Sequence, residues 1–120
     1  MNTKAEIGQK GELIARRHLQ EKGYILLEEN WRFKKAEIDI ICKKEALLIF
    51  VEVKTKSYDF YGKPEESLNQ LQEARIMDAA QRYMEEIGHN WEIRFDIISI
   101  ILDKSLKLSK IEHFEDAFFY

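Results

Sequence analysis

Cysteine and proline are almost missing from this chain, which holds one of each in 120 residues. A single cysteine, Cys42, cannot form an intrachain disulfide bond, so cysteine usage favours a reducing compartment. No stretch approaches the ~20 apolar residues that a membrane-spanning helix needs, and the polar N-terminal residues lack the apolar core of a signal peptide. These absences predict a cytoplasmic protein without a membrane partner.

The composition is that of a folded globular protein, with 45% hydrophobic and 34% charged residues. A chain of this length is expected to form one domain, residues 1–120. Hydrophobic periodicity and turn signals predict elements in the order αβββαββ. The expected ranges are 3–22, 24–30, 37–41, 47–54, 64–87, 91–102 and 106–114. This order predicts an α/β fold with a mixed β-sheet flanked by helices.

Charged side chains stand inside two neighbouring predicted strands that are otherwise rich in Ile, Val and Phe. Because side chains alternate along a strand, Glu37 and Asp39 share one face, and Glu52 and Lys54 share one face. The segment between the strands is short enough for an antiparallel hairpin, which places Asp39 opposite Glu52 to within a residue or two. Two carboxylates and an ammonium group are therefore expected on one face.

Two carboxylates a few ångströms apart repel each other unless a cation neutralises them. Mg²⁺ or Mn²⁺ takes such oxygen ligands and keeps water and phosphate oxygens as further ligands. Asp39 and Glu52 are thus candidate metal ligands, and Lys54 is a candidate for stabilising charge on a phosphate. The parts fit phosphodiester hydrolysis. Because the pattern acidic-x-Lys also arises by chance, a salt-bridged hairpin edge stays an open alternative.

The charge distribution favours nucleic acid more than the net charge of −3 does. Between residues 32 and 63 lie eight Lys and Arg against five Asp and Glu, and such a local positive field attracts a phosphate backbone. Arg32, Lys34 and Lys35 alternate with aromatic residues, which suits base stacking and phosphate pairing. The same pattern also suits a loop anchored by a buried Trp31.

The segment after Lys54 is predicted to be a loop, and loops that leave strand ends often carry function. Lys56 continues the face of Glu52 and Lys54, so it is a candidate phosphate contact. The loop also holds three aromatic residues that could stack on unpaired bases or close the rim of the core, namely Tyr58, Phe60 and Tyr61.

Several short motifs occur together along nearly the whole chain. They are Gly8, Gly11-Glu12, Gly23-Tyr24, Asn30-Trp31-Arg32, Glu37-Ile38-Asp39-Ile40-Ile41, Phe50-Val51-Glu52-Val53-Lys54 and Arg94-Phe95-Asp96. This combination resembles the YraN family of small bacterial proteins, which are similar to Holliday-junction resolvases and to restriction-endonuclease-like PD-(D/E)xK nucleases. The resemblance implies a restriction-endonuclease-like domain that cuts DNA, with branched or otherwise structured DNA as a candidate substrate. The alternative is a non-catalytic nucleic-acid-binding module with the same fold.

The resemblance also implies roles for individual residues, with Mg²⁺ or Mn²⁺ as cofactor. The implied catalytic set is Asp39, Glu52, Lys54 and Glu12. The Val53 carbonyl is implied as a further metal ligand, and Gln72 as a nucleic-acid contact where the family often has Lys. Two positions depart from the family pattern, since Ala36 replaces a usual Gly and Gln72 carries no charge. Because resolvase-like nucleases tend to pair two active sites, a homodimer is one expected assembly.

Overall fold

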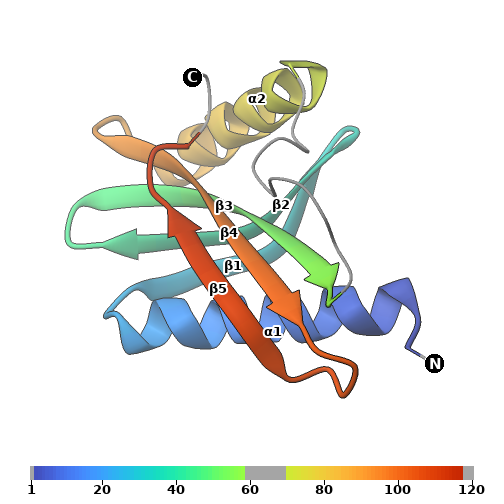
Figure 1. The fold of residues 1–120 in the computed structure, drawn as a ribbon. Helices are drawn as coiled ribbons and strands as arrows, with labels where there is room; N and C mark the ends of the chain where they lie inside the picture. The colour runs from blue at the N-terminus through green and yellow to red at the C-terminus, as the bar shows by residue number, and fades with distance from the viewer. Residues whose placement is uncertain (1, 59–69, 118–120) are drawn as a thin grey trace.

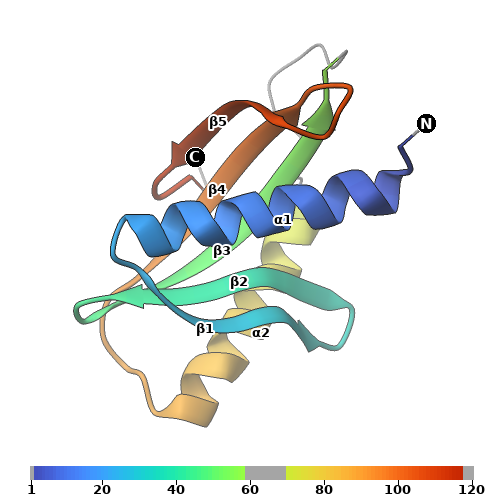
Figure 2. The ribbon, with the colours of Figure 1, turned by 90° about the horizontal axis from the view of Figure 1, so that it is seen from below.

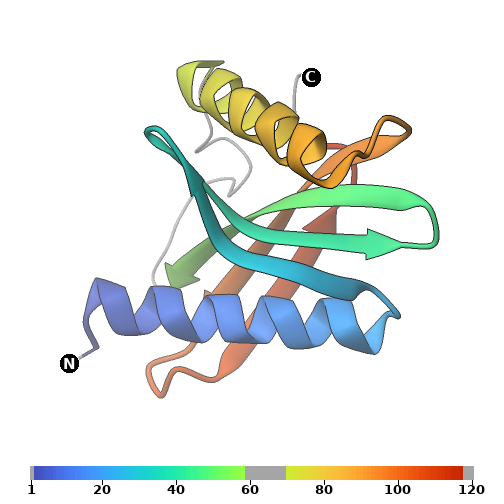
Figure 3. The same ribbon diagram turned by 180° about the vertical axis from the view of Figure 1, so that it is seen from behind.

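A five-stranded β-sheet forms the middle layer of the protein, with one helix against each face (Figures 1 and 3). The structure is a computed structural model that describes residues 2–58 and 70–117. The elements are α1 (Lys4–Glu21), β1 (Ile25–Phe33), β2 (Ala36–Lys44), β3 (Leu47–Ser57), α2 (Gln70–Ile87), β4 (Ile93–Leu102) and β5 (Leu108–Phe114). The predicted α/β class and the order αβββαββ are confirmed, as is the mixed sheet.

The strands lie in the order β1-β2-β3-β4-β5. Strands β1, β2 and β3 form an antiparallel meander, β4 runs parallel to β3, and β5 returns antiparallel to β4. A parallel neighbour requires a crossover connection, and α2 lies in the connection between β3 and β4. The strands at the two edges of the sheet are β1 and β5.

The sheet buries apolar side chains on both faces, so the protein has two hydrophobic clusters. The cluster between α1 and the sheet consists of Ala15, Leu19, Tyr24, Ile40, Cys42, Ile49, Val51, Ile98, Ile100 and Leu102. The cluster between α2 and the sheet consists of Ala36, Ile38, Ile41, Leu48, Phe50, Ile76, Ala79, Ala80, Tyr83, Phe95 and Ile97. Burial on both faces explains why β3 and β4 are almost continuously apolar in sequence.

Helix α1 begins and ends where the sequence predicts. The Thr3 hydroxyl accepts a hydrogen bond from the Glu6 amide, and the Glu6 carboxylate accepts one from the Thr3 amide, both at 3.1 Å, which is a capping box. The chain leaves the helix through Gly23, whose φ of +89° favours glycine. The axis of α1 crosses one face of the sheet diagonally (Figure 2).

The bounds of several strands differ from the sequence-based ranges. Strand β3 continues to Ser57 because residues 55–57 pair with β4, and residues 31–33 belong to β1 because they pair with β2. Leu71, an apolar residue in the first turn of α2, is 61% exposed. The predicted helix start at Pro64 lies outside the described residues, as do Phe60 and Tyr61. Among the helices that are described, none combines the length and apolar character needed to cross a membrane.

Candidate active site

The site lies where β2 separates from β3. The pairing of the two strands runs from Lys44 opposite Leu47 to Ile40 opposite Val51. Ile38 then packs beneath α2, whereas Ile40 packs beneath α1. Figure 3 shows the end of the β1–β2 hairpin curving toward α2 at this point. Two strands that part in this way leave space between them for polar side chains.

Asp39 and Glu52 occupy this space, as the hairpin register predicts. The Val53 backbone amide donates a hydrogen bond to the Asp39 carboxylate at 2.8 Å. The Lys54 ammonium lies 3.6 Å from a Glu52 carboxylate oxygen, and the two side chains are only 16% and 12% exposed. The structure thus brings the three predicted side chains together in a partly buried setting.

Two hollows meet at the two carboxylates. The α1-side hollow, of about 490 Å³, includes Gly8, Glu12, Val53, Lys54 and Lys56 in its lining. The α2-side hollow, of about 410 Å³, includes Lys35, Glu37, Gln72 and Arg75. Asp39 and Glu52 line both. Anything that fills both hollows would therefore pass over the carboxylate pair.

Burial works against the negative charge of this pair. It raises the pKa of Asp39, and the hydrogen bond from Val53 offsets only part of the shift, while Glu12 adds to it. Burial also raises the pKa of Glu52, and the charge of Asp39 raises it further, while Lys54 lowers it. The ionised pair is therefore short of positive charge, which is the condition that a bound divalent cation relieves.

Further acidic groups surround the pair. Glu12 reaches the α1-side hollow from α1, and burial and the charge of Glu37 raise its pKa. Asn30, with its amide nitrogen facing the carboxylates, donates hydrogen bonds to Glu12 at 2.7 Å and to Glu37 at 3.0 Å. Asn30 has a φ of +50°, a conformation that Asn tolerates better than most residues. The implied position of Glu12 near the site is thus observed.

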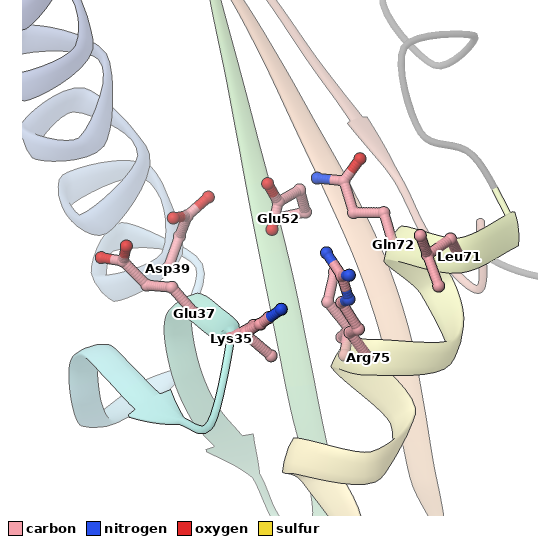
Figure 4. Close-up of a pocket in the computed structure, with 9 residues that line it drawn as sticks. Lys35, Glu37, Asp39, Glu52, Leu71, Gln72 and Arg75 are labelled. Atoms are coloured by element: carbon pink, nitrogen blue, oxygen red, sulfur yellow. The ribbon is translucent and has the colours of Figure 1, made fainter.

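Basic and amide side chains also line the α2-side hollow, and Figure 4 shows Gln72 and Arg75 facing Asp39 and Glu52 from α2. Lys35 comes from the β1–β2 turn, and Gln72 and Arg75 come from the first turns of α2. Lys35 and Gln72 are among the predicted nucleic-acid contacts, whereas Arg75 is not. Arg75 is exposed, but it also lines the α2-side hollow. Arg75 lies three residues after Gln72 and therefore on the same face of the helix, and this spacing is the feature of the sequence that indicates a place for Arg75 near Gln72.

Two of the predicted nucleic-acid contacts lie outside the described linings of both hollows. Arg32 forms an ion pair with Glu37 at 3.1 Å, and Lys34 lies 3.8 Å from Asp78. The ring centroid of Trp31 lies 5.2 Å from that of Tyr83 on α2, in an edge-to-face arrangement. Of the two interpretations of this segment, the contact favours Trp31 as an anchor of the hairpin against α2.

A separate buried ionisable cluster lies on the α1 side of the sheet. Asp96 is fully buried and accepts hydrogen bonds from Arg94 and His113 at 2.8 Å and from the Asp116 amide at 3.0 Å. Burial raises the pKa of Asp96, but these hydrogen bonds outweigh it, so the net shift is downward. Arg94 also donates to the Tyr24 hydroxyl at 2.9 Å. The charge of the buried Asp96 is thus balanced by hydrogen bonds from a side chain two residues earlier on β4 and from residues near the C-terminal end of β5.

The oxygen ligands at the carboxylate pair fit a hard divalent cation that takes only a few of its ligands from the protein. Within residues 2–58 and 70–117, no three His, Cys, Asp or Glu side chains converge as a metal-binding group. Mg²⁺, however, is often held by one or two carboxylates and completes its coordination with water and phosphate oxygens. Asp39 and Glu52, with the Val53 backbone between Glu52 and Lys54, provide such a partial set.

The mixed sheet with a helix on each face, and the carboxylates at the point where two strands part, define an α/β protein of restriction-endonuclease-like architecture. The family model described as "Uncharacterised protein family UPF0102" matches residues 11–100. The chain belongs to this family.

Related chains match it over nearly their whole length. A UPF0102 protein of Flavobacterium psychrophilum is 44% identical, with 96% of this chain and 95% of the relative covered. A UPF0102 protein of Christiangramia forsetii is 45% identical, with 96% of this chain and 95% of the relative covered. A UPF0102 protein of Parabacteroides distasonis is 40% identical, with 95% and 93% covered.

Proposed function

We propose that this protein is a metal-dependent endonuclease that hydrolyses phosphodiester bonds of DNA at branched or otherwise structured sites. The observation that supports the proposal best is the pair Asp39 and Glu52. Both carboxylates line both hollows, both have raised pKa values, and Lys54 is in contact with Glu52. A partly buried carboxylate pair next to a lysine has no evident value for stability, because desolvated charge is costly.

In this proposal the chain's own groups hold the cation and orient the substrate. Asp39, Glu52 and the Val53 carbonyl hold Mg²⁺ or Mn²⁺, and the Val53 amide keeps the Asp39 carboxylate in place through its 2.8 Å hydrogen bond. The cation, when bound, would neutralise charge and polarise the phosphoryl group. Lys54 then faces the reacting phosphate and stabilises the negative charge that develops on it. Glu12 is the acidic group on the α1 side of that phosphate.

Basic groups on both sides of the carboxylates support a phosphate backbone as the ligand. Lys35 and Arg75 line the α2-side hollow, and Lys54 and Lys56 line the α1-side hollow. These basic side chains lie on both sides of the acidic pair. A nucleic-acid strand that crosses the pair would therefore contact Lys or Arg side chains on both sides of the scissile phosphate. Gln72 adds a hydrogen-bonding group without charge.

The test is cleavage of duplex, flapped and four-way DNA with Mg²⁺ or Mn²⁺ by wild-type protein and by Lys54→Ala. Loss of the lysine is expected to reduce cleavage by about two to three orders of magnitude, as for other groups that stabilise transition-state charge. Lys43→Ala is the matched control, because Lys43 is an exposed lysine at the other end of the β2–β3 hairpin. It is expected to cut like the wild type.

Two outcomes contradict the proposal. If the wild type cuts none of these DNAs but binds them, and Lys54→Ala binds equally well, the protein is a binding module with a nuclease-like fold. If Lys54→Ala cuts as fast as the wild type, the observed cleavage does not depend on the proposed site.

A further inference from the structure

A third hollow adjoins the active site at the end of β3. Its volume is about 460 Å³, and its lining includes Ile7, Ser57, Tyr58, Leu102, Lys104 and Leu106. Ile7 and Ser57 also line the α1-side hollow, so the two hollows share a wall. A strand that leaves the carboxylates along β3 would enter this third hollow next.

Tyr58 gives the hollow an exposed aromatic ring. Its side chain is 55% exposed, and the Lys104 ammonium lies 5.2 Å from the ring centroid, within the range of a cation–π interaction. Trp91 is the other aromatic residue among the exposed large side chains of the described chain. Its indole donates to the Ala46 carbonyl in the β2–β3 turn, at the far end of β3 from Tyr58. Tyr58 therefore stands out by its position beside the site.

The turn that presents Lys104 is held by hydrogen bonds. The Asp103 carboxylate accepts from the Ser105 amide at 2.8 Å and from the Lys107 amide at 2.9 Å. The Asn2 side chain donates to the Lys104 carbonyl at 2.9 Å, which ties the turn to the N-terminal end of α1. Asp103 also lines the hollow. Its carboxylate is held by these two backbone amides, whereas the Lys104 ammonium faces the Tyr58 ring.

We propose that this third hollow binds an unpaired DNA base next to the active site, with the base stacked on Tyr58 and its phosphate near Lys104. The inference rests on the proposed function and deepens it. The lining combines the apolar side chains of Ile7, Leu102 and Leu106 with an aromatic ring and a cation, which matches a flat base attached to an anionic backbone. Bases inside a duplex are already stacked on each other, so the ligand is single-stranded.

The spacing gives the position of this base relative to the cut. Tyr58 directly follows β3 and lies six residue steps after Glu52, which is about 20 Å at ~3.3 Å per residue. At ~3.4 Å per nucleotide in a duplex-like strand this is roughly six nucleotides, and fewer in an extended strand. The proposed substrate class is therefore DNA with a single-stranded arm of several nucleotides beside the scissile bond.

The test measures binding without chemistry. Fluorescence anisotropy in EDTA compares a dye-labelled single strand with a duplex of the same length, for the wild type, Tyr58→Ala and Tyr58→Trp. Stacking losses on alanine substitution predict single-strand binding that is about 5- to 150-fold weaker for Tyr58→Ala, with duplex binding unchanged. Tyr58→Trp is expected to bind single strands at least as tightly as the wild type.

Two matched controls separate the hollow from general surface effects. Trp91→Ala removes an exposed aromatic ring at the other end of β3, and Lys107→Ala removes an exposed lysine from the same turn as Lys104. Both are expected to bind single strands like the wild type, whereas Lys104→Ala is expected to bind them more weakly.

The inference and the proposed function fail in different ways. If the wild type shows cleavage that depends on Lys54, but Tyr58→Ala binds single strands like the wild type, the inference is wrong and the proposed function stands. Equal losses for Trp91→Ala and Tyr58→Ala also overturn the inference. If the wild type binds neither form of DNA, both are wrong.

Discussion

Asp39 and Glu52 are held close together although burial and mutual repulsion disfavour their charges. The Val53 amide orients Asp39, and Lys54 compensates part of the charge on Glu52. Strain of this kind persists where the surrounding structure enforces it, and it is typical of functional sites. We therefore expect the free energy of unfolding of the metal-free protein to be lower than that of the same fold without the charged carboxylate pair.

Glu52→Gln tests this expectation directly. Because the pKa of Glu52 is raised in the folded protein, its ionised form destabilises the fold above the ordinary pKa, and a neutral amide removes that cost. In EDTA at slightly alkaline pH, the free energy of unfolding is expected to rise by about 1 kcal/mol. Mn²⁺ is expected to stabilise the wild type but not the variant in urea unfolding. Glu112→Gln, at a half-exposed carboxylate on β5, is the control. Equal stabilisation of the wild type and Glu52→Gln by Mn²⁺ would contradict the account.

Asp96 has the opposite pH dependence. Its pKa is lowered in the folded protein, so its contribution is fully present above the ordinary value and is lost as the pH falls through the lowered pKa. Asp96→Asn is expected to cost about 3 kcal/mol at neutral pH, because it removes the buried carboxylate that Arg94 and His113 contact and leaves Arg94 only the exposed Glu115. In urea unfolding, the difference from the wild type should stay constant down to about pH 4 and shrink below it. A difference that grows on acidification would be inconsistent with this, and the exposed Asp78→Asn should behave like the wild type.

Local sequence rules explain which site residues could be predicted. Asp39, Glu52 and Lys54 follow from hairpin pairing and strand alternation, which operate over short distances along the chain. The contacts of Asn30 with Glu12, and the arrival of Arg75 from α2, depend on how distant elements pack. No periodicity in the sequence encodes that packing.

At the scale of elements, α1 approaches β3 at a single glycine. A Cβ placed on Gly11 would lie 2.7 Å from the Cβ of Thr55, closer than the two atoms can remain. This close approach also positions the next residue, Glu12, over the carboxylate pair. A Cβ placed on Gly8, one turn earlier, would meet no atom within 4 Å.

The two glycines therefore give a matched pair of substitutions. Gly11→Ala is expected to reduce the free energy of unfolding by about 1–3 kcal/mol, because α1 or Thr55 must move. Gly8→Ala is expected to increase it by about 0.5–1 kcal/mol, because alanine is the better helix former. Urea unfolding measures both changes. A Gly11→Ala protein as stable as Gly8→Ala would show that α1 does not pack closely on Thr55.

The element boundaries show the same limit of local reasoning. The order and type of the elements follow from periodicity, capping and turn signals. The extension of β3 to Ser57 does not, because its partner residues on β4 lie more than forty residues later in the chain. The exposure of Leu71 likewise depends on where the first turn of α2 lies relative to the edge of the sheet. Helical spacing alone cannot indicate this position.

At the scale of the whole molecule, the net charge is −3, yet cations line both hollows at the carboxylates. Binding of DNA by such a protein would depend on the local field rather than on net charge. Because each phosphate contact releases counterions, Arg75→Ala is expected to reduce the slope of log K against log salt by about 0.7–0.9. Arg82→Ala, on the same helix and paired with Glu86 at 3.2 Å, should leave the slope unchanged. Identical slopes for the wild type and Arg75→Ala would exclude Arg75 as a phosphate contact.

The most direct test of the central claim is a crystal of the protein soaked in Mn²⁺ and measured for anomalous scattering. The account predicts one strong peak between the carboxylates of Asp39 and Glu52, and no such peak in a Glu52→Gln crystal soaked in the same way. A soaked wild-type crystal with no anomalous density between these two carboxylates would contradict it.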